Sequence, residues 1–114
     1  MKQTVFLDID GTIVFHEGDL EQMMKQMHLL PKTVSKLKEW RRNGVYIVLT
    51  TARPEGIRSH VESQLHSRGV FYDQLIMGLP TGPRTVINDT KPDGTITAKA
   101  HPLHRDQGIG EIEL

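Results

Sequence analysis

The sequence predicts an α/β domain built on a mostly parallel sheet. Residues 5–7 and 45–49 are short apolar segments, typical of strands that are covered on both faces, and a helical pattern follows each of them. Strands that alternate with helices in this way are joined by right-handed crossovers and lie parallel in one sheet. Because 114 residues can form one hydrophobic core but not two, we expect a single domain over residues 1–114.

Two amphipathic helices are expected to connect the predicted strands. The first begins near Pro31, which suits a first helical turn, and ends where Asn43 and Gly44 supply a stop signal. The second covers residues 54–68, where three apolar side chains recur at four-residue spacing: Ile57, Val61 and Leu65. Each helix therefore presents one apolar stripe to the sheet.

The remaining predicted elements are shorter. Residues 12–18 alternate apolar and polar side chains and then turn, so we expect a small hairpin flap there. Three more strands are predicted, over residues 75–77, 85–87 and 95–100. The tail from residue 101 is expected to be coil or an edge segment.

Composition excludes several classes of function. Fourteen Lys and Arg residues balance fourteen Asp and Glu residues, so no overall field exists to hold nucleic acid or an anionic membrane, and we expect neither as a partner. The chain has no cysteine, which excludes disulfides, thiolate metal ligands and a cysteine nucleophile. No apolar run is long enough to span a bilayer or to form the core of a signal peptide, so we expect a cytoplasmic location.

Polar side chains follow three of the predicted strands. Asp8 and Asp10 follow the first strand, Thr50 and Thr51 the second, and Asp89 the fourth. Ligands of open α/β sheets bind beyond the carboxyl ends of the strands, where these side chains converge. The sequence therefore predicts an active site at that edge of the sheet.

Asp8 and Asp10 are suited to phosphoryl chemistry with a metal ion. Side chains two positions apart on an extended chain point to the same face, and two carboxylates so near repel unless a cation lies between them. Mg²⁺ is the natural cation, because it takes hard oxygen ligands and bridges a carboxylate to a phosphate, and Asp89 can complete the protein ligands. One carboxylate can attack phosphorus to form an aspartyl-phosphate, while the other protonates the leaving oxygen and later activates water.

Other residues near these strand ends can bind the phosphate. A hydroxyl of Thr50 or Thr51 can donate to a phosphoryl oxygen, and Gly11 lets backbone N–H groups approach it. Two basic side chains flank the third acidic residue. Either Arg84 or Lys91 can neutralise charge in the intermediate, and both stay open at this point.

Three of these segments resemble motifs of the haloacid dehalogenase (HAD) superfamily. Residues 5–12, an apolar strand followed by Asp-x-Asp-Gly-Thr, resemble the first motif. Residues 45–53, a strand that leads into Thr-Thr-Ala-Arg, are similar to the second motif, whose strand ends in Thr-Gly-Arg, and this alignment makes Thr51 the phosphate contact. Residues 82–89 resemble the third and fourth motifs, in which a basic residue, here Arg84, precedes a strand that ends in an acid.

The resemblance implies a Rossmann-like, three-layer α/β/α core with a mostly parallel sheet and no large cap. It also implies that Asp8 is the nucleophile, that Asp10 is the acid/base and gives Mg²⁺ its backbone carbonyl, and that Asp89 is a further metal ligand. The implied activity is magnesium-dependent hydrolysis of phosphate monoesters, with a small phosphorylated metabolite such as a sugar phosphate as substrate. Capless members act on large substrates or close the site with a neighbouring subunit, so a homo-oligomer that closes the open site is an expected assembly.

A second interpretation is a catalytically weak module of this fold that binds a phosphorylated ligand or a partner protein. It is motivated by Asn88, which stands beside Asp89 where the family often has a second acid. The presence of Asp10 favours the enzyme over the binding module, because a binding module has no need of an acid/base.

Overall fold

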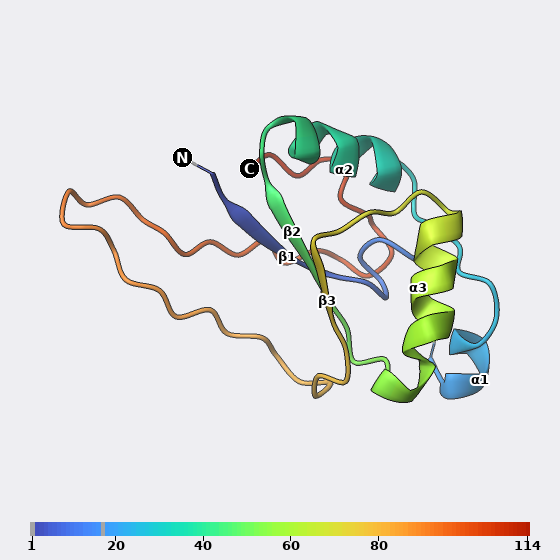
Figure 1. Cartoon of the computed structure of the whole chain (residues 1–114). Coiled ribbons are helices and arrows are strands. Elements are labelled where there is room, and N and C mark those ends of the chain that lie inside the picture. The colour runs from blue at the N-terminus through green and yellow to red at the C-terminus, as the bar shows by residue number, and fades with distance from the viewer. Residues whose placement is uncertain (1, 17) are drawn as a thin grey trace.

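Three parallel strands form the sheet of the structure, a computed structural model that describes residues 2–16 and 18–114 (Figure 1). The sheet has the order β1-β2-β3, with strands β1 (Thr4–Asp8), β2 (Tyr46–Thr50) and β3 (Gln74–Ile76). Its register pairs Asp8 with Thr50 and Thr50 with Ile76, so the carboxyl ends of all three strands lie level. The predicted α/β class and the parallel sheet are confirmed.

The helices are α1 (Leu20–Met23), α2 (Thr33–Arg42) and α3 (Arg58–Ser67), and a 3₁₀ turn, η1 (Glu55–Ile57), leads into α3. The two longer helices confirm the two predicted from the sequence. The chain turns away after α2 at Gly44, whose φ of +76° is a left-handed conformation that glycine adopts without strain. Among the described residues, no helix has both the length and the apolar character needed to cross a membrane.

Both longer helices cover the same face of the sheet (Figure 1). α2 precedes β2 and α3 precedes β3, so the two crossovers step across the sheet in the same direction. Right-handed crossovers that step the same way place their helices on one face. A three-layer core was expected, with helices on both faces of the sheet. A helix on the second face needs a crossover that returns past β1. In the described part of the chain no helix follows β3, so that layer is not formed. Phe6, on the opposite face, is consequently 60% exposed.

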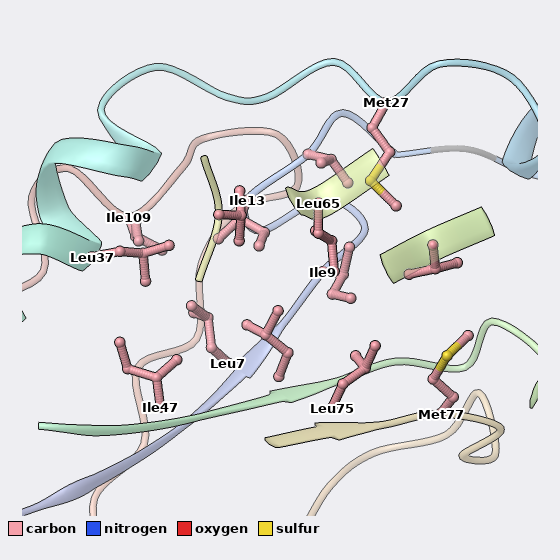
Figure 2. Packing of buried hydrophobic residues seen from close by; sticks show 14 of the residues in the cluster. Leu7, Ile9, Ile13, Met27, Leu37, Ile47, Leu65, Leu75, Met77 and Ile109 are labelled. Carbon is pink, nitrogen blue, oxygen red and sulfur yellow. The ribbon is translucent and has the colours of Figure 1, made fainter. Parts of the chain in front are cut away.

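One hydrophobic core fills the space between the covered face and the helices (Figure 2). Leu7, Leu49 and Leu75 form one row across the three strands. They are buried in the same cluster as Leu37 of α2 and Leu65 of α3. Burying a leucine side chain contributes about 1.5–3 kcal/mol, and slipping a strand by one residue would turn its leucine to the other face. The core therefore fixes the register that sets the strand ends level.

The C-terminal residues return to this core. Ile109 is buried in the same cluster as Leu37 (Figure 2). The N–H of Asp106 donates to the carbonyl of Gly11 at 2.8 Å, and Asp106 Oδ1 accepts from the N–H of His16 at 2.9 Å. The tail, predicted as coil or an edge segment, has no regular secondary structure, but it braces the loop that follows β1.

The hairpin flap predicted over residues 12–18 is wrong. Ile13 and Val14 are fully buried in the core, and Val14 forms an isolated antiparallel bridge with Leu29. The apolar alternation in this segment reflects burial rather than an exposed flap. The part of the prediction that falls on residue 17 lies outside the described residues.

Residues 80–104, here called the arm, leave the sheet and return to it without regular secondary structure (Figure 1). The strands predicted over residues 85–87 and 95–100 are not formed. Those predictions rested on apolar composition, but strand preference depends on packing against neighbours, and Ile87 is 91% exposed. At the tip, the N–H of Lys91 donates to the carbonyl of Thr95 at 3.0 Å and closes a turn.

We predict that trypsin cuts the arm before it cuts the helices. The bond after Lys99 lies in the arm, whereas the bond after Lys38 lies in α2, although both side chains are exposed. Proteases act on locally unfolded chain, so helical pairing protects the second bond. Mass spectrometry of a brief digest should detect cleavage after Lys99 well before cleavage after Lys38. Equal rates, or protection of Lys99, would show that the arm is paired.

Candidate active site

Asp8 is the last residue of β1 and stands at the carboxyl edge of the sheet. Arg84 donates from Nη1 to Asp8 Oδ1 at 3.0 Å, and Thr12 donates from Oγ1 to Asp8 Oδ2 at 3.2 Å. The side chains of Asp8 and Arg84 are 33% and 39% exposed. An ion pair this exposed is weak, so a ligand can reach the Asp8 carboxylate and compete for Arg84.

Asp10 is held by a buried guanidinium. Arg53 Nε donates to Asp10 Oδ2 at 2.9 Å, and Arg53 Nη2 donates to Asp10 Oδ1 at 2.6 Å. The third nitrogen, Nη1, donates to the carbonyl of Met23 at 3.2 Å. The Arg53 side chain has no exposed surface, and that of Asp10 is 15% exposed. A bidentate, charge-assisted pair of this kind fixes the orientation of the carboxylate.

The two aspartates therefore stand in different environments. Ile9 lies between them in the sequence and is buried in the core. A cation was expected to offset their repulsion, and in the structure each carboxylate faces its own guanidinium, from Arg84 or from Arg53. One carboxylate is reachable and weakly paired, whereas the other is fixed.

Gly11 lies in the turn that follows Asp10 and leads to the buried residues Ile13 and Val14. Its φ of +83° favours glycine, and its N–H donates to the carbonyl of Val14 at 2.7 Å. A Cβ atom added to Gly11 would lie 3.2 Å from Cγ of Arg105. Gly11 is thus required by the turn and by the close approach of the C-terminal segment, and its contact with phosphate stays a prediction.

Thr50 and Thr51 lie at the end of β2, beside the end of β1. Thr50 is in register with Asp8. Thr51 is buried, and its Oγ1 accepts from the N–H of Arg53 at 3.0 Å. The observed role of Thr51 is to hold the turn that carries Arg53, and its contact with phosphate stays a prediction.

Of the two basic candidates, the structure brings Arg84 to Asp8. Lys91 lies near the tip of the arm. Asp89 is also exposed on the arm, where its carbonyl accepts from the hydroxyl of Thr97. Asp89 is five positions after Arg84, which corresponds to about 17 Å along an extended chain. The structure does not group Asp89 with the other two aspartates, and its role as a metal ligand stays a prediction.

Sequence reasoning missed the contacts of Arg53 and of the C-terminal segment. Arg53 belongs to the stretch that resembles the second motif, but no local pattern indicates that its guanidinium reaches Asp10, 43 positions away. The approach of Arg105 to Gly11, and the hydrogen bond from Asp106, come from a tail without periodicity. The composition of these segments carries no signal for such contacts.

Comparison with known protein families agrees with the motifs. A family model described as haloacid dehalogenase-like hydrolase matches residues 5–72, more than half of the chain. The chain belongs to this family. The matched region of this HAD-like protein includes Asp8, Asp10 and Arg53, whereas the whole arm lies beyond it.

Two solved structures share the HAD-like fold. A crystal structure of a protein from Vibrio cholerae matches with a TM-score of 0.54 and 18% identity, over 78% of this chain and 81% of that chain. A chain in the structure of the Pnkp1/Rnl/Hen1 RNA repair complex matches with a TM-score of 0.57 and 25% identity, over 81% of this chain. The match spans only 28% of that longer chain. A search among curated proteins finds no match.

We predict that the two aspartates differ in their effect on stability. Asp10→Ala leaves the buried Arg53 guanidinium without its counter-ion, which should lower the free energy of unfolding by about 3–5 kcal/mol. Asp8→Ala removes only a partly exposed pair, and the loss should be about 0–1 kcal/mol. Urea denaturation followed by circular dichroism measures both values. Comparable losses for the two variants would contradict the difference in pairing.

Proposed function

We propose that this chain is a magnesium-dependent phosphohydrolase that cleaves phosphate monoesters through an aspartyl-phosphate on Asp8. The observation that carries the proposal is the unequal pairing of two carboxylates inside the family match: Asp8 is reachable, whereas Asp10 is fixed by Arg53. A nucleophile must be free to reach phosphorus, and an acid/base must be held within hydrogen-bond distance of the oxygen that it serves. The two environments match these two requirements.

The reaction has two steps. An oxygen of Asp8 attacks phosphorus, the ester P–O bond breaks, and a protonated Asp10 gives its proton to the leaving oxygen. In the second step, water attacks phosphorus and gives a proton to Asp10. This attack breaks the bond between phosphorus and Asp8 and releases inorganic phosphate. Each Asp10 oxygen accepts one N–H from Arg53 and keeps a second lone pair, so the pairing leaves a place for the proton.

Arg84 is the proposed phosphate-binding cation. Its guanidinium reaches only one oxygen of Asp8, from Nη1 at 3.0 Å, and the pair is partly exposed. A phosphate dianion offers more charge and can accept two parallel N–H bonds from a guanidinium. Substrate binding would therefore transfer Arg84 from Asp8 to the phosphate and free the Asp8 carboxylate for attack.

The donor set near Asp8 suits a sparse Mg²⁺ site. Mg²⁺ in phosphoryl-transfer sites usually keeps several waters and binds one or two carboxylates together with the substrate phosphate. In the part of the chain that the structure describes, no three acidic or histidine side chains are grouped so that they could hold a metal. The proposed protein ligands are therefore few, namely the Asp8 carboxylate and the Asp10 carbonyl, and Asp89 joins them only if the arm moves. Mg²⁺ bound there would offset charge on the phosphate.

The first candidate substrate is a small phosphorylated metabolite such as a sugar phosphate. No cap domain is present among the described elements: α1 has four residues, and a single helical segment lies between β2 and β3. The site is thus open, and we propose that a neighbouring copy in a homo-oligomer closes it. A small substrate needs such closure to be shielded from water.

A second candidate substrate is the phosphate at the end of a nucleic-acid strand. The likeness to a chain of an RNA repair complex favours it, and an open site admits a strand end. The arm carries Arg84, Lys91 and Lys99, one cation more than its two acids, Asp89 and Asp93. Because phosphate contacts make binding salt-dependent, hydrolysis of an oligonucleotide phosphate that weakens steeply with salt would favour this candidate.

Hydrolysis of an aryl phosphate tests the proposed activity. We expect wild-type hydrolysis that requires Mg²⁺ and stops with a chelator. Asp8→Asn should lower kcat by about 10⁴-fold or more, as loss of a reacting side chain does in other covalent catalysts. Asp93→Asn, at the exposed tip of the arm, is the control and should leave kcat unchanged.

Two outcomes would count against the proposal. Activity that survives Asp8→Asn would exclude this residue as the nucleophile. A folded wild-type protein that binds Mg²⁺ but hydrolyses no ester would instead favour a module that binds a phosphorylated ligand or a partner protein.

A pair of arm variants decides which cation serves the site. Arg84→Gln should lower kcat/KM by about 10- to 100-fold, because a hydrogen bond to a charged group contributes about 1.5–3 kcal/mol. Lys91→Gln removes the same charge seven residues further along and should leave kcat/KM unchanged. Steady-state kinetics on one ester compares the two. A larger effect of Lys91→Gln would show that the arm changes position when substrate binds.

A further inference from the structure

We propose that Arg53 is a positioning residue for the acid/base, holding the Asp10 carboxylate in the orientation needed for proton transfer. The inference rests on the proposed function and adds to it a residue outside the chemistry itself. Arg53 has no exposed surface and therefore acts through Asp10 rather than on substrate.

The guanidinium of Arg53 binds both carboxylate oxygens of Asp10 through its Nε–Nη2 edge. Nε and Nη2 each donate to a different carboxylate oxygen, at 2.9 Å and 2.6 Å. Two parallel bonds fix the carboxylate plane as well as its distance, which a single bond cannot do. Proton transfer depends on this geometry, because a displacement of about 1 Å can cost about 100-fold in rate.

Arg53 is itself held by other segments. Nη1 donates to the carbonyl of Met23, the last residue of α1. The main-chain N–H of Arg53 donates to Thr51 Oγ1 at 3.0 Å, and the Arg53 carbonyl accepts from the N–H of Gly78 at 2.8 Å. The end of β2 and the segment after β3 thus hold the main chain of Arg53, and α1 holds its guanidinium. Asp10 is held by a group that has little freedom to move.

A purely structural role explains this arrangement less well. Replacing a buried ion pair with apolar residues of similar size is often neutral or stabilising, so burial alone does not require an arginine here. Both strong bonds of Arg53 end on the residue that the proposed mechanism uses as acid/base. A fixed carboxylate at this position serves proton transfer directly.

Arg58 offers a matched control in the same segment. It donates from Nε and Nη2 to the two carboxylate oxygens of Glu55, both at 2.7 Å, and from Nη2 to the carbonyl of Leu75 at 3.0 Å. The hydrogen bond from Arg58 lowers the pKa of Glu55. The bonding pattern resembles that of Arg53, but Glu55 is an exposed residue of η1 outside the proposed site.

The test compares two esters that differ in their need for an acid. A nitrophenyl phosphate has a stable leaving group and depends little on protonation, whereas an alkyl phosphate depends on it strongly. Arg53→Lys keeps the charge but loses the two parallel hydrogen bonds. We expect kcat/KM on the alkyl ester to fall by about 10- to 100-fold, with a clearly smaller loss on the nitrophenyl ester, because kcat/KM reports the first phosphoryl transfer and not the later hydrolysis that both esters share. Arg58→Lys should change neither.

A double-mutant cycle adds a second readout. If Arg53 acts through Asp10, then Asp10→Asn combined with Arg53→Lys should be no slower on the alkyl ester than Asp10→Asn alone. Additive losses, equal losses on the two esters, or an Arg53→Lys variant with wild-type rates would each overturn the positioning role. A wild-type protein inactive on both esters would contradict the proposed function, and the inference would fail with it.

A measurement on the wild-type protein covers the case in which Arg53 variants do not fold. Hydrogen exchange of arginine Nε–H groups by NMR should be much slower for Arg53 than for Arg58, because only Arg53 is fully buried in its pair. Exchange of Arg53 as fast as that of Arg58 would show that the grip on Asp10 is absent and would overturn the proposal.

Discussion

The buried ion pair between Arg53 and Asp10 is the interaction on which the site depends. It joins the turn after β2 to the loop after β1, and its third nitrogen ties α1 to both. Because the pair is buried, removing either partner is strongly destabilising, since it leaves an uncompensated charge inside the protein. The parallel register brings the two strand ends level, and the ion pair then determines how one carboxylate beyond them is oriented.

The same pair explains how two aspartates in one short motif can have different roles. Asp10 is fixed by a guanidinium without exposed surface, whereas Asp8 shares a partly exposed contact with Arg84, a residue of the arm. A weak contact can be exchanged for a substrate phosphate, and a strong buried contact cannot. The proposed division into nucleophile and acid/base thus follows from burial, since both side chains are carboxylates of the same type.

The sequence predicted the elements whose signals are local. Apolar runs predicted β1, β2 and β3, helical spacing predicted α2 and α3, and the Asp-x-Asp-Gly-Thr stretch predicted the family. Predictions from the sequence failed where long-range packing determines the structure. Ile13 is buried in the core and does not belong to an exposed flap, and residues 85–87 pair with no strand. The contact of Arg53 with Asp10 joins positions 43 apart, and no periodicity records such a pair.

Trapping the covalent intermediate tests the central claim most directly. Wild-type protein mixed with Mg²⁺ and an aryl phosphate would be quenched in acid within one turnover, digested, and examined by mass spectrometry for a peptide that carries an added phosphoryl group. The account predicts that the group is found on Asp8 and is absent from Asp8→Asn. A phosphoryl group on another residue would contradict Asp8 as the nucleophile. So would a burst of released alcohol, which marks accumulation of a covalent intermediate, without any peptide phosphorylated on Asp8.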